Sequence, residues 1–527
     1  MFTSPAITTR STRRWLPRLS GLAFSFVAFS GFAGSIGRGA DPEVFQFHHE
    51  GVLGTSLDLQ VNAADAAQAG AVETAVLEEI ERLRKILSTY DPESEISHFN
   101  TSTGPVKCSP ELLDVLGYYD FWNFKSAGAY NGHLGDLIAA WKGAEKAGAL
   151  PDAATLQRIV RALPQAGWKL DRAAGTAARL PGGALAIDSL GKGYIISKAA
   201  VAARAKAPGV PGFLVNIGGD MYASGVPAAG APWTIGVADP KRNADNAPPL
   251  TQVRVSNRGV STSAAYERGY TIGGRRFSHI FDPRTGLPAN GVASATVIAS
   301  NTASSNALAT TLCVLRPEEG LALVRQIPDV ECLIVAADGR QIRSPRFSAF
   351  EVPPAPAAAA TVGTPAGAPA GAPGLWPSGY EVGLTITLKT PPPGGKGGPR
   401  RPYVAVWVED ENAQRLRTVA VWGNRLKYLP DLPAWWKVAQ QDQAWAQSVT
   451  RATRPAGQHR IVWDGLDDKG KPLPRATYTI VLEVARQNGT HALENGKIVC
   501  GNLPATGTIP AATEFGVASI SYGPPGQ

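Results

Sequence analysis

The sequence of 527 residues has few of the residue types that build zinc sites and disulfide scaffolds. Its four cysteines are Cys108, Cys313, Cys332 and Cys500; no two form a CxxC pair, and the seven histidines make no Cys/His cluster with zinc spacing. A structural zinc site and a cysteine framework are therefore excluded. Cys313 and Cys332 lie in apolar runs and are predicted to be buried small hydrophobes. A disulfide between them is the alternative.

Long runs of like charge are also scarce. The net charge is +8, but Lys and Arg are dispersed, apart from short clusters within residues 10–18 and 396–401. A dispersed basic balance is typical of a solvated surface rather than of a nucleic-acid-binding face. No nucleic-acid partner is expected.

The chain also lacks an apolar run long enough for a confident membrane span. Near its start, LSGLAFSFVAFSGFAG follows Arg10, Arg13, Arg14 and Arg18 and precedes small residues. A charged head, an apolar middle and small residues are typical of an export signal. We predict that residues 1–40 are this signal, that the protein is exported to the periplasmic or cell-envelope side, and that no stable membrane span remains. A retained N-terminal anchor is the alternative.

Composition divides the rest of the chain into three parts. Residues 41–352 mix helical and strand patterns, which predicts an α+β domain. Within it we predict a first strand pair with a turn at Gly54, an amphipathic helix over residues 71–87, further helices over 110–126 and 153–162, and a closing hairpin over 332–345. Residues 353–377 are rich in Pro, Ala and Gly, which predicts an extended linker. Residues 378–527 are predicted to be an all-β, sandwich-like domain. Its clearest alternating segments are EVGLTITLKT, YVAVWVED, TVAVWG, HRIVWDG and TYTIVLEVAR.

The stretch from Ser261 to Thr311 contains most of the chemistry. A polar turn, SHIFDPRTG, is followed by a strand pattern, ASATVIAS, and then by small residues that open a helix. Asn306 and Thr310 lie four residues apart, so they share one face of that helix. A helix N-terminus attracts anions, and side-chain oxygens hold hard cations. These features predict a metal-assisted phosphate site.

A second candidate for phosphate binding lies upstream. LAIDSLGKGYIISKAAVAARAKA is predicted to form a strand, a tight Gly191–Lys192–Gly193 turn and a helix. A lysine between glycines at a helix start offers backbone N–H groups and one mobile cation to a phosphate. The spacing is not that of a Walker A loop.

The order of several motifs resembles that of the ApbE family, which comprises FAD:protein FMN transferases. The resemblance covers residues 44–350, and SHIFDPRTGLP is its most specific part. The residues after 379 resemble an uncharacterised β-rich domain that is sometimes fused to these transferases. The motifs are LGTSLDLQV, STYDPESEISHFN, GAYNGHLGDLIAAW, SLGKGYIISKA, LVNIGGDMYASG, STSAAYERGY, SHIFDPRTGLP and ATVIASNTASSNALATTLCVL.

The resemblance implies an α+β flavin-transferase fold with FAD bound in a cleft and Mg²⁺ at its pyrophosphate. FMN would pass to a Thr or Ser hydroxyl of a partner protein, such as an exported redox protein, with release of AMP. The acceptor segment in such partners resembles Asp-x-x-Ser/Thr-Gly-Ala-Thr/Ser. Phosphoryl transfer of this kind depends on charge neutralisation and positioning more than on covalent catalysis.

The same resemblance assigns roles to residues of this sequence. His279 would be a proton acceptor or positioning group, and Asp282 would flank the reaction centre. Lys192 would neutralise a phosphate oxygen. The metal would be held by a backbone carbonyl near Ser189 and by the side chains of Asn306 and Thr310. The flavin or adenosine would be contacted by Leu53, Tyr90, Ala129, Tyr130, Asn131 and Ile280.

One departure from the family pattern concerns the metal. The helix that carries Asn306 usually has Asp at that position as the main metal carboxylate, and hard cations favour carboxylates. Asp188, four residues before Lys192, is the candidate replacement. Three hypotheses therefore stand: a magnesium-dependent flavin transferase, an FAD-binding protein with weak or no transfer, and a non-enzymatic surface-assembly or binding protein.

Overall fold

The computed structural model describes residues 43–524 with internal gaps. The gaps are residues 181, 228–230, 243, 245, 266–267, 354–373, 391–400, 424–425, 443–444, 447–448, 452 and 487–488. The predicted export signal and most of the predicted linker lie outside the described residues. Within the described ranges, no helix is long and apolar enough to cross a membrane.

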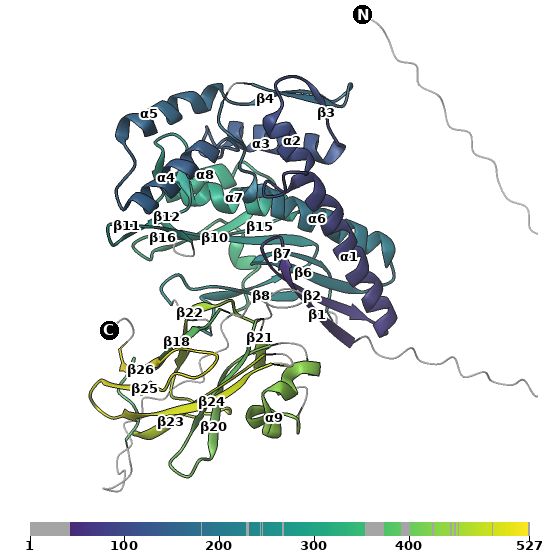
Figure 1. Ribbon diagram of the computed structural model, residues 1–527. Coiled ribbons are helices and arrows are strands. Elements are labelled where there is room, and N and C mark those ends of the chain that lie inside the picture. The colour runs from purple at the N-terminus through teal and green to yellow at the C-terminus, as the bar shows by residue number, and fades with distance from the viewer. Residues whose placement is uncertain are drawn as a thin grey trace, which may run out of the picture. The chain divides into compact units, whose positions relative to one another are not determined.

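An eight-stranded sheet forms the centre of the N-terminal region (Figure 1). Its order is β1-β2-β6-β7-β10-β15-β16-β17, and all neighbouring strands are antiparallel. The predicted first strand pair, with its turn at Gly54, and the predicted closing hairpin are both confirmed. The strands are β1 (Glu43–Val52), β2 (Thr55–Ala63), β6 (Gly212–Ile217), β7 (Asp220–Gly225), β10 (Arg258–Ala264), β15 (Val292–Ala299), β16 (Glu331–Ala336) and β17 (Gln341–Arg343).

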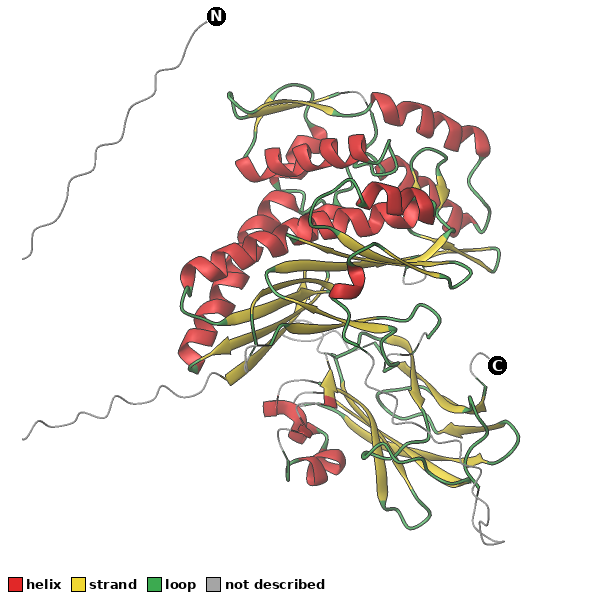
Figure 2. Ribbon diagram, turned by 180° about the vertical axis from the view of Figure 1, so that it is seen from behind, coloured by secondary structure: helices red, strands yellow, loops and turns green. Residues whose placement is uncertain are grey.

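Three helices cover one face of this sheet (Figure 2): α1 (Ala66–Leu87), α6 (Asp188–Lys206) and α7 (Thr302–Val314). Helix α1 begins earlier than its apolar pattern predicted, because the Asp65 side chain accepts a hydrogen bond from the Gln68 N–H and caps it. Helix α7 is capped in the same way by Asn301. The apolar sides of the three helices and the facing strand residues form one buried core.

A hairpin of β8 (Trp233–Val237) and β9 (Thr251–Val255) covers the opposite face. Alternate residues of both strands are buried. Ile235 and Val253 pack in one cluster with Val260, Ile298 and Leu333 of the central sheet. The inner strands of the sheet are therefore buried on both faces.

Smaller elements surround the helical side. Trp141 of α4 donates a hydrogen bond from Nε1 to the Gly286 carbonyl (3.1 Å), which fixes the turn after Asp282. Two further helices agree with the predicted ranges, 110–126 and 153–162. These elements are α2 (Glu95–Thr101), β3 (Val106–Lys107), α3 (Pro110–Lys125), α4 (Gly135–Ala147), α5 (Ala153–Ala162), β4 (Trp168–Asp171), β5 (Thr176–Arg179), β11 (Gly269–Ile272), β12 (Arg275–Ser278), β13 (Phe281–Asp282), β14 (Leu287–Pro288) and α8 (Pro317–Val324).

The C-terminal region consists of two sheets, as the alternating pattern predicted. Their orders are β22-β18-β26-β25 and β21-β20-β19-β23-β24, and their facing side chains share one core. The strands are β18 (Glu381–Leu388), β19 (Tyr403–Glu409), β20 (Arg415–Trp422), β21 (Thr450–Arg451), β22 (Gly457–Trp463), β23 (Ala476–Ala485), β24 (His491–Cys500), β25 (Ala505–Ile509) and β26 (Ala518–Gly523). Helix α9 (Pro433–Ala439) packs outside β19 and β23.

Two local predictions were settled by the structure. The predicted Gly191–Lys192–Gly193 turn is wrong, because these residues lie inside α6, and residues 184–187 directly before that helix form no strand. The four cysteines are all free, so the alternative of a Cys313–Cys332 disulfide is wrong. Cys313 and Cys332 are buried, as predicted.

Candidate functional site

Helices α6 and α7 cross at very close range beside the start of β7. A Cβ atom on Gly193 would lie 2.5 Å from the Thr302 carbonyl oxygen and 2.8 Å from the Asn306 Cβ. Real atoms do not approach so closely, so glycine is required there. Ser197, one turn further along α6, accepts a hydrogen bond from the Thr302 N–H (3.0 Å). This crossing brings Lys192 and Asn306 to the same point.

Lys192 and Asn306 both contact the carboxylate of Asp220, the first residue of β7. Lys192 Nζ lies 2.6 Å from Asp220 Oδ2. Asn306 Nδ2 donates to Asp220 Oδ1 (3.1 Å). The Asp220 side chain is only 5% exposed, so this carboxylate is buried and balanced by one ammonium group.

The amide oxygen of Asn306 is buried, because the residue is only 6% exposed, and no described residue donates a hydrogen bond to it. A carboxylate only accepts hydrogen bonds, so the Asn306 amide must direct Nδ2 to Asp220 and cannot exchange its two ends. A buried acceptor without a partner costs about 1–3 kcal/mol, and in a native structure such an atom indicates a water or an ion that binds there. Oδ1 of Asn306 therefore fits a hard cation. The described residues contain no group of three or more His, Cys, Asp or Glu side chains arranged for a metal, so such a cation would rely largely on neutral oxygens.

The other two predicted metal residues flank Asn306 and Lys192 on their helices. The hydroxyl of Thr310 has only long contacts, 3.3 Å to the Asn306 carbonyl and 3.3 Å to Ser263 Oγ. Ser189 Oγ donates to the Tyr130 hydroxyl (3.0 Å) and lies 3.2 Å from the Tyr119 hydroxyl. The first turn of α6 is thus fixed against the ring pair of Tyr119 and Tyr130, which are stacked 5.2 Å apart.

His279 lies between β12 and β13, and one of its ring nitrogens is hydrogen-bonded to the backbone. Nδ1 lies 3.0 Å from the Arg268 carbonyl oxygen. Because that oxygen only accepts, Nδ1 carries the proton and Nε2 keeps its lone pair in the neutral ring. Burial lowers the pKa of His279 below its ordinary value of 6.5, and the charges of Arg268 and Arg276 lower it further. The ring is therefore neutral at pH 7 and can accept a proton at Nε2.

Asp282 holds the next turn. Its side chain accepts from the Arg284 N–H (2.9 Å) and from the Arg284 guanidinium at Nε (2.9 Å) and Nη2 (2.8 Å). Ile280 is buried beside it. The structure thus gives Asp282 a turn-forming contact, and it directs Arg284 from the same turn to a cavity.

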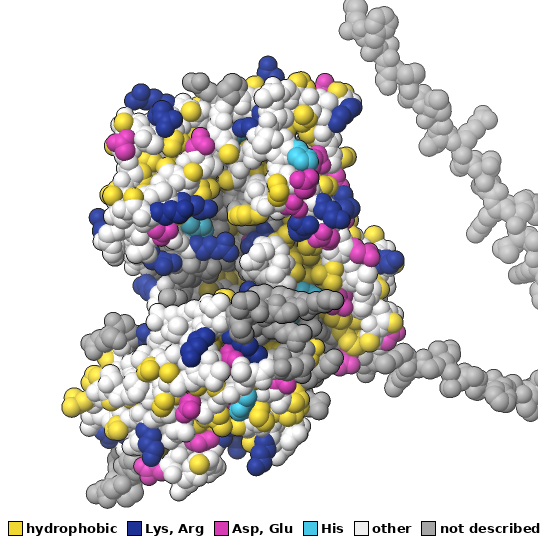
Figure 3. Space-filling view, in the orientation of Figure 1, with side chains coloured by type: hydrophobic (Ala, Val, Ile, Leu, Met, Phe, Trp, Pro, Cys, Tyr) yellow, Lys and Arg dark blue, Asp and Glu magenta, His cyan; other side chains and the backbone are white. Residues whose placement is uncertain are grey.

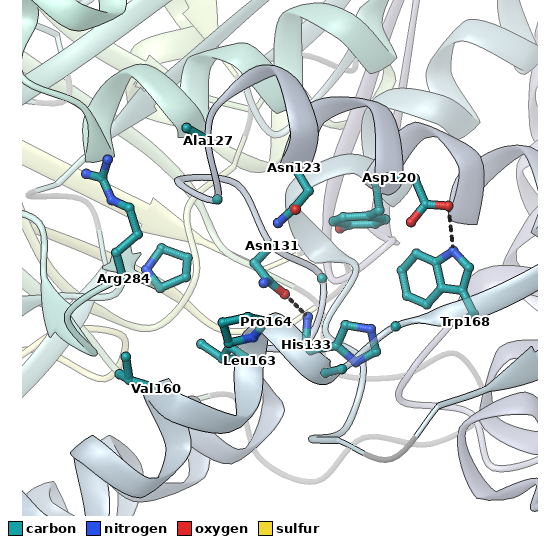
Figure 4. Close-up of a pocket in the computed structure, with 16 residues that line it drawn as sticks. Asp120, Asn123, Ala127, Asn131, His133, Val160, Leu163, Pro164, Trp168 and Arg284 are labelled. Atoms are coloured by element: carbon teal, nitrogen blue, oxygen red, sulfur yellow. Dashed lines mark hydrogen bonds between the residues drawn. The ribbon is translucent and has the colours of Figure 1, made fainter.

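The cavity has a volume of about 510 Å³ and is open to solvent. Figure 4 shows Arg284 on one side, Trp168 on the opposite side, and Asn131 and His133 between them. Asn131 Oδ1 accepts from the His133 N–H (2.7 Å), and Trp168 donates to Asp120 (3.0 Å). Tyr119 also lines the cavity, so the Tyr119–Ser189 contact joins it to the start of α6.

The remaining predicted residues are dispersed. Tyr90 is 81% exposed, whereas Ala129 and Tyr130 are buried. Leu53 lies in the β1–β2 turn with a positive φ of 49° and is half-buried. Asp188 begins α6, but its side chain lies outside the described residues. The structure thus gathers Lys192, Asn306 and Thr310 in one place and Asn131 in the cavity.

Sequence reasoning missed Asp220, Tyr119 and Arg268. Asp220 follows a Gly218–Gly219 turn at the end of a buried strand, where both glycines have positive φ. An acid directly after such a turn at a strand end is a signal that could have identified it. Arg268 contributes a backbone oxygen, and Tyr119 lies within an apolar helix, so neither has a signal in the sequence.

Basic side chains accompany this site on the surface. Figure 3 shows Lys and Arg gathered over the region of the β11–β12 hairpin, where Arg268, Arg275 and Arg276 are exposed. Arg268 and Arg276 act on His279, and positive charge beside that residue attracts anionic ligands.

One family match spans all the residues of this site. Residues 53–334 match the ApbE family, and that range includes every predicted site residue. The chain belongs to the ApbE family. Residues 384–516 match a second family, described as a predicted periplasmic protein of the DUF2271 type. The ApbE portion therefore contains most of the central sheet and the Lys192–Asp220–Asn306 cluster, and the DUF2271 portion contains most of the two-sheet region.

Individual relatives agree with this assignment. A protein of Treponema pallidum (strain Nichols) named FAD:protein FMN transferase is 30% identical over 310 residues, which is 55% of this chain and 84% of the relative. One of the same name from Escherichia coli (strain K12) is 26% identical over 321 residues, 57% of this chain and 87% of the relative. The crystal structure of the ApbE protein of Thermotoga maritima matches with 25% identity and a TM-score of 0.53 over 59% of this chain and all of that one.

Proposed function

We propose that this ApbE-family protein transfers FMN from FAD to a Thr or Ser hydroxyl of a partner protein, with Mg²⁺ required and AMP released. The observation that carries the proposal is the family match across residues 53–334, which spans Lys192, His279 and Asn306. The relatives named above as FAD:protein FMN transferases support the same reaction. The export pattern of residues 1–40 and the second family's description favour a periplasmic location, and a retained anchor is the alternative.

The reaction joins the acceptor oxygen to the FMN phosphorus and breaks the bond from that phosphorus to the bridging oxygen of FAD. AMP leaves with the bridging oxygen. The acceptor hydroxyl proton goes to a base, and the free Nε2 of neutral His279 is the group suited to take it. Bound magnesium would neutralise the pyrophosphate charge, held by Asn306, Thr310 and a backbone oxygen near Ser189.

The other residues of the site bind and orient FAD in this proposal. Lys192 supplies positive charge at the phosphates. Asn131 and Arg284 offer polar contacts from the cavity, and Leu53 and Tyr90 offer apolar ones. Ile280 is buried and supports the turn that carries Asp282. Ala129 and Tyr130 are too buried to cover a flavin face. The part of Tyr130 is to fix the first turn of α6 through Ser189.

A second candidate function is FAD binding with weak or no transfer. It is favoured by Asn306, which offers an oxygen without the charge that a hard cation prefers. A non-enzymatic assembly role is the third. The partner is expected to be an exported protein, and no nucleic acid is involved in any of the three.

The test separates the three functions. The purified protein is incubated with FAD, with and without Mg²⁺, and with a peptide that contains the segment Asp-x-x-Ser-Gly-Ala-Thr. Mg²⁺-dependent AMP release with one FMN added to the peptide mass supports the transferase. Flavin fluorescence changes without AMP would support the FAD-binding protein. No change in flavin fluorescence would leave only the assembly role.

A further inference from the structure

The Asp220 carboxylate is built into the fold with little freedom. Gly218 and Gly219 have φ values of 57° and 92°, and a Cβ on Gly218 would lie 2.8 Å from the Thr55 side chain. Gly219 N–H also donates to Asn216 Oδ1 (3.0 Å). The turn therefore sets the direction in which β7 starts. Asp220, the first residue of β7, places its side chain between Lys192 of α6 and Asn306 of α7.

The charge of Asp220 is balanced by Lys192 in the structure. Lys192 and Asp220 cancel, and Asn306 is neutral. Asn306 Nδ2 is committed to Asp220, and its Oδ1 is a buried acceptor without a donor. The hydrogen-bonded pair of Asp220 and Asn306 thus offers one carboxylate and one unsatisfied amide oxygen. Hard divalent cations bind oxygen ligands of both kinds.

The Lys192 ammonium cannot form a full ion pair with Asp220 and with a substrate phosphate at the same time. In the structure its ammonium lies on Asp220 Oδ2. A pyrophosphate that attracts this ammonium leaves Asp220 with an unbalanced buried charge, which is costly unless another positive group replaces it.

We propose that Asp220 supplies the carboxylate charge of the divalent-cation site, with Asn306 Oδ1 as its neutral partner. This inference rests on the proposed cation requirement of the transferase. Asp220 exchanges the Lys192 ammonium for the cation when a phosphate ligand binds. Cation and pyrophosphate therefore favour each other's binding, and by linkage the effect is reciprocal.

The test measures cation binding rather than activity. Free Mn²⁺ is followed by electron paramagnetic resonance as intact protein is added, without flavin and then with ADP as the pyrophosphate ligand. ADP should tighten Mn²⁺ binding to the wild-type protein. Asp220→Asn should weaken Mn²⁺ binding about tenfold or more, because ligand charge governs affinity for hard cations. Asn306→Asp should strengthen it, and Asp220→Asn combined with Asn306→Asp should return it close to the wild-type value.

Asp114→Asn is the matched control. Asp114 also faces α6 and lies 3.8 Å from Lys198 Nζ, but it is 38% exposed and does not contact Lys192 or Asn306 in the described structure, so its loss should leave Mn²⁺ binding unchanged. Circular dichroism of each variant confirms folding, and Asn306→Asp tests the site even if Asp220→Asn unfolds. Wild-type Mn²⁺ affinity in folded Asp220→Asn, or no gain in Asn306→Asp, would overturn the inference. If FMN transfer to the peptide persists in that case, the proposed function still stands.

Discussion

The neutral ring of His279 determines how the proposed transfer responds to pH. Burial and two arginines lower its pKa below 6.5, so the base form persists to lower pH than for an ordinary histidine. We expect the acid limb of kcat/KM to lie below pH 6.5. His279→Asn should reduce kcat by roughly 10²–10⁴-fold and remove the limb.

Arg276→Gln tests the cause of this shift. Removing that charge should raise the His279 pKa and move the limb to higher pH. Arg275→Gln is the control, because Arg275 is the neighbouring strand residue and packs over the Phe277 ring, with 5.5 Å from guanidinium carbon to ring centroid. A limb that stays in place in Arg276→Gln, or that survives in His279→Asn, would contradict the role of His279.

At the scale of elements, the crossing of α6 and α7 depends on one glycine. Gly193→Ala forces a methyl group against the Thr302 carbonyl oxygen, a backbone atom that cannot rotate away. We expect a loss of about 1–3 kcal/mol in the free energy of unfolding, measured by urea denaturation. Gly191→Ala is the control. Its nearest neighbour is the flexible end of Ile187 at 3.3 Å, so it should be neutral or gain about 0.5–1 kcal/mol. Equal stability of the two variants would show that the helices do not need this contact.

The same glycines explain where sequence reasoning succeeded and failed on elements. Repeated apolar positions such as Val72, Val76 and Ile80 were enough to predict α1, because that helix buries one face. Gly191 and Gly193 were interpreted as a turn, because local rules give glycine to turns. Both lie in a helix, and α7 presses against Gly193. That contact joins segments more than a hundred residues apart. Asp220 was missed for the same reason, since its partners come from α6 and α7 and from no local pattern.

At the scale of the whole molecule, the four cysteines are free although the chain is proposed to be exported. Cys313, Cys332 and Cys500 are buried, and burial raises the pKa of each thiol to about 12. These thiols are protonated and shielded, so they react slowly. A thiol reagent such as DTNB should label at most Cys108 in the native protein and all four cysteines after unfolding in guanidinium chloride. Fewer than four reactive thiols in the unreduced, unfolded protein would indicate a disulfide.

The order of the central strands has a consequence for how the protein folds. Strand β2 pairs with β6 from Leu57 with Ile217 to Asn62 with Gly212, and all helices from α1 to α6 belong to the loop between them. Closing so long a loop costs chain entropy before the paired strands repay it, which makes such pairings slow. Asp220 follows β6 directly, and α7 comes later still. The polar cluster at Asp220 therefore assembles only in the last, slowest phase of refolding, and cation binding should appear with that phase rather than with early helix formation.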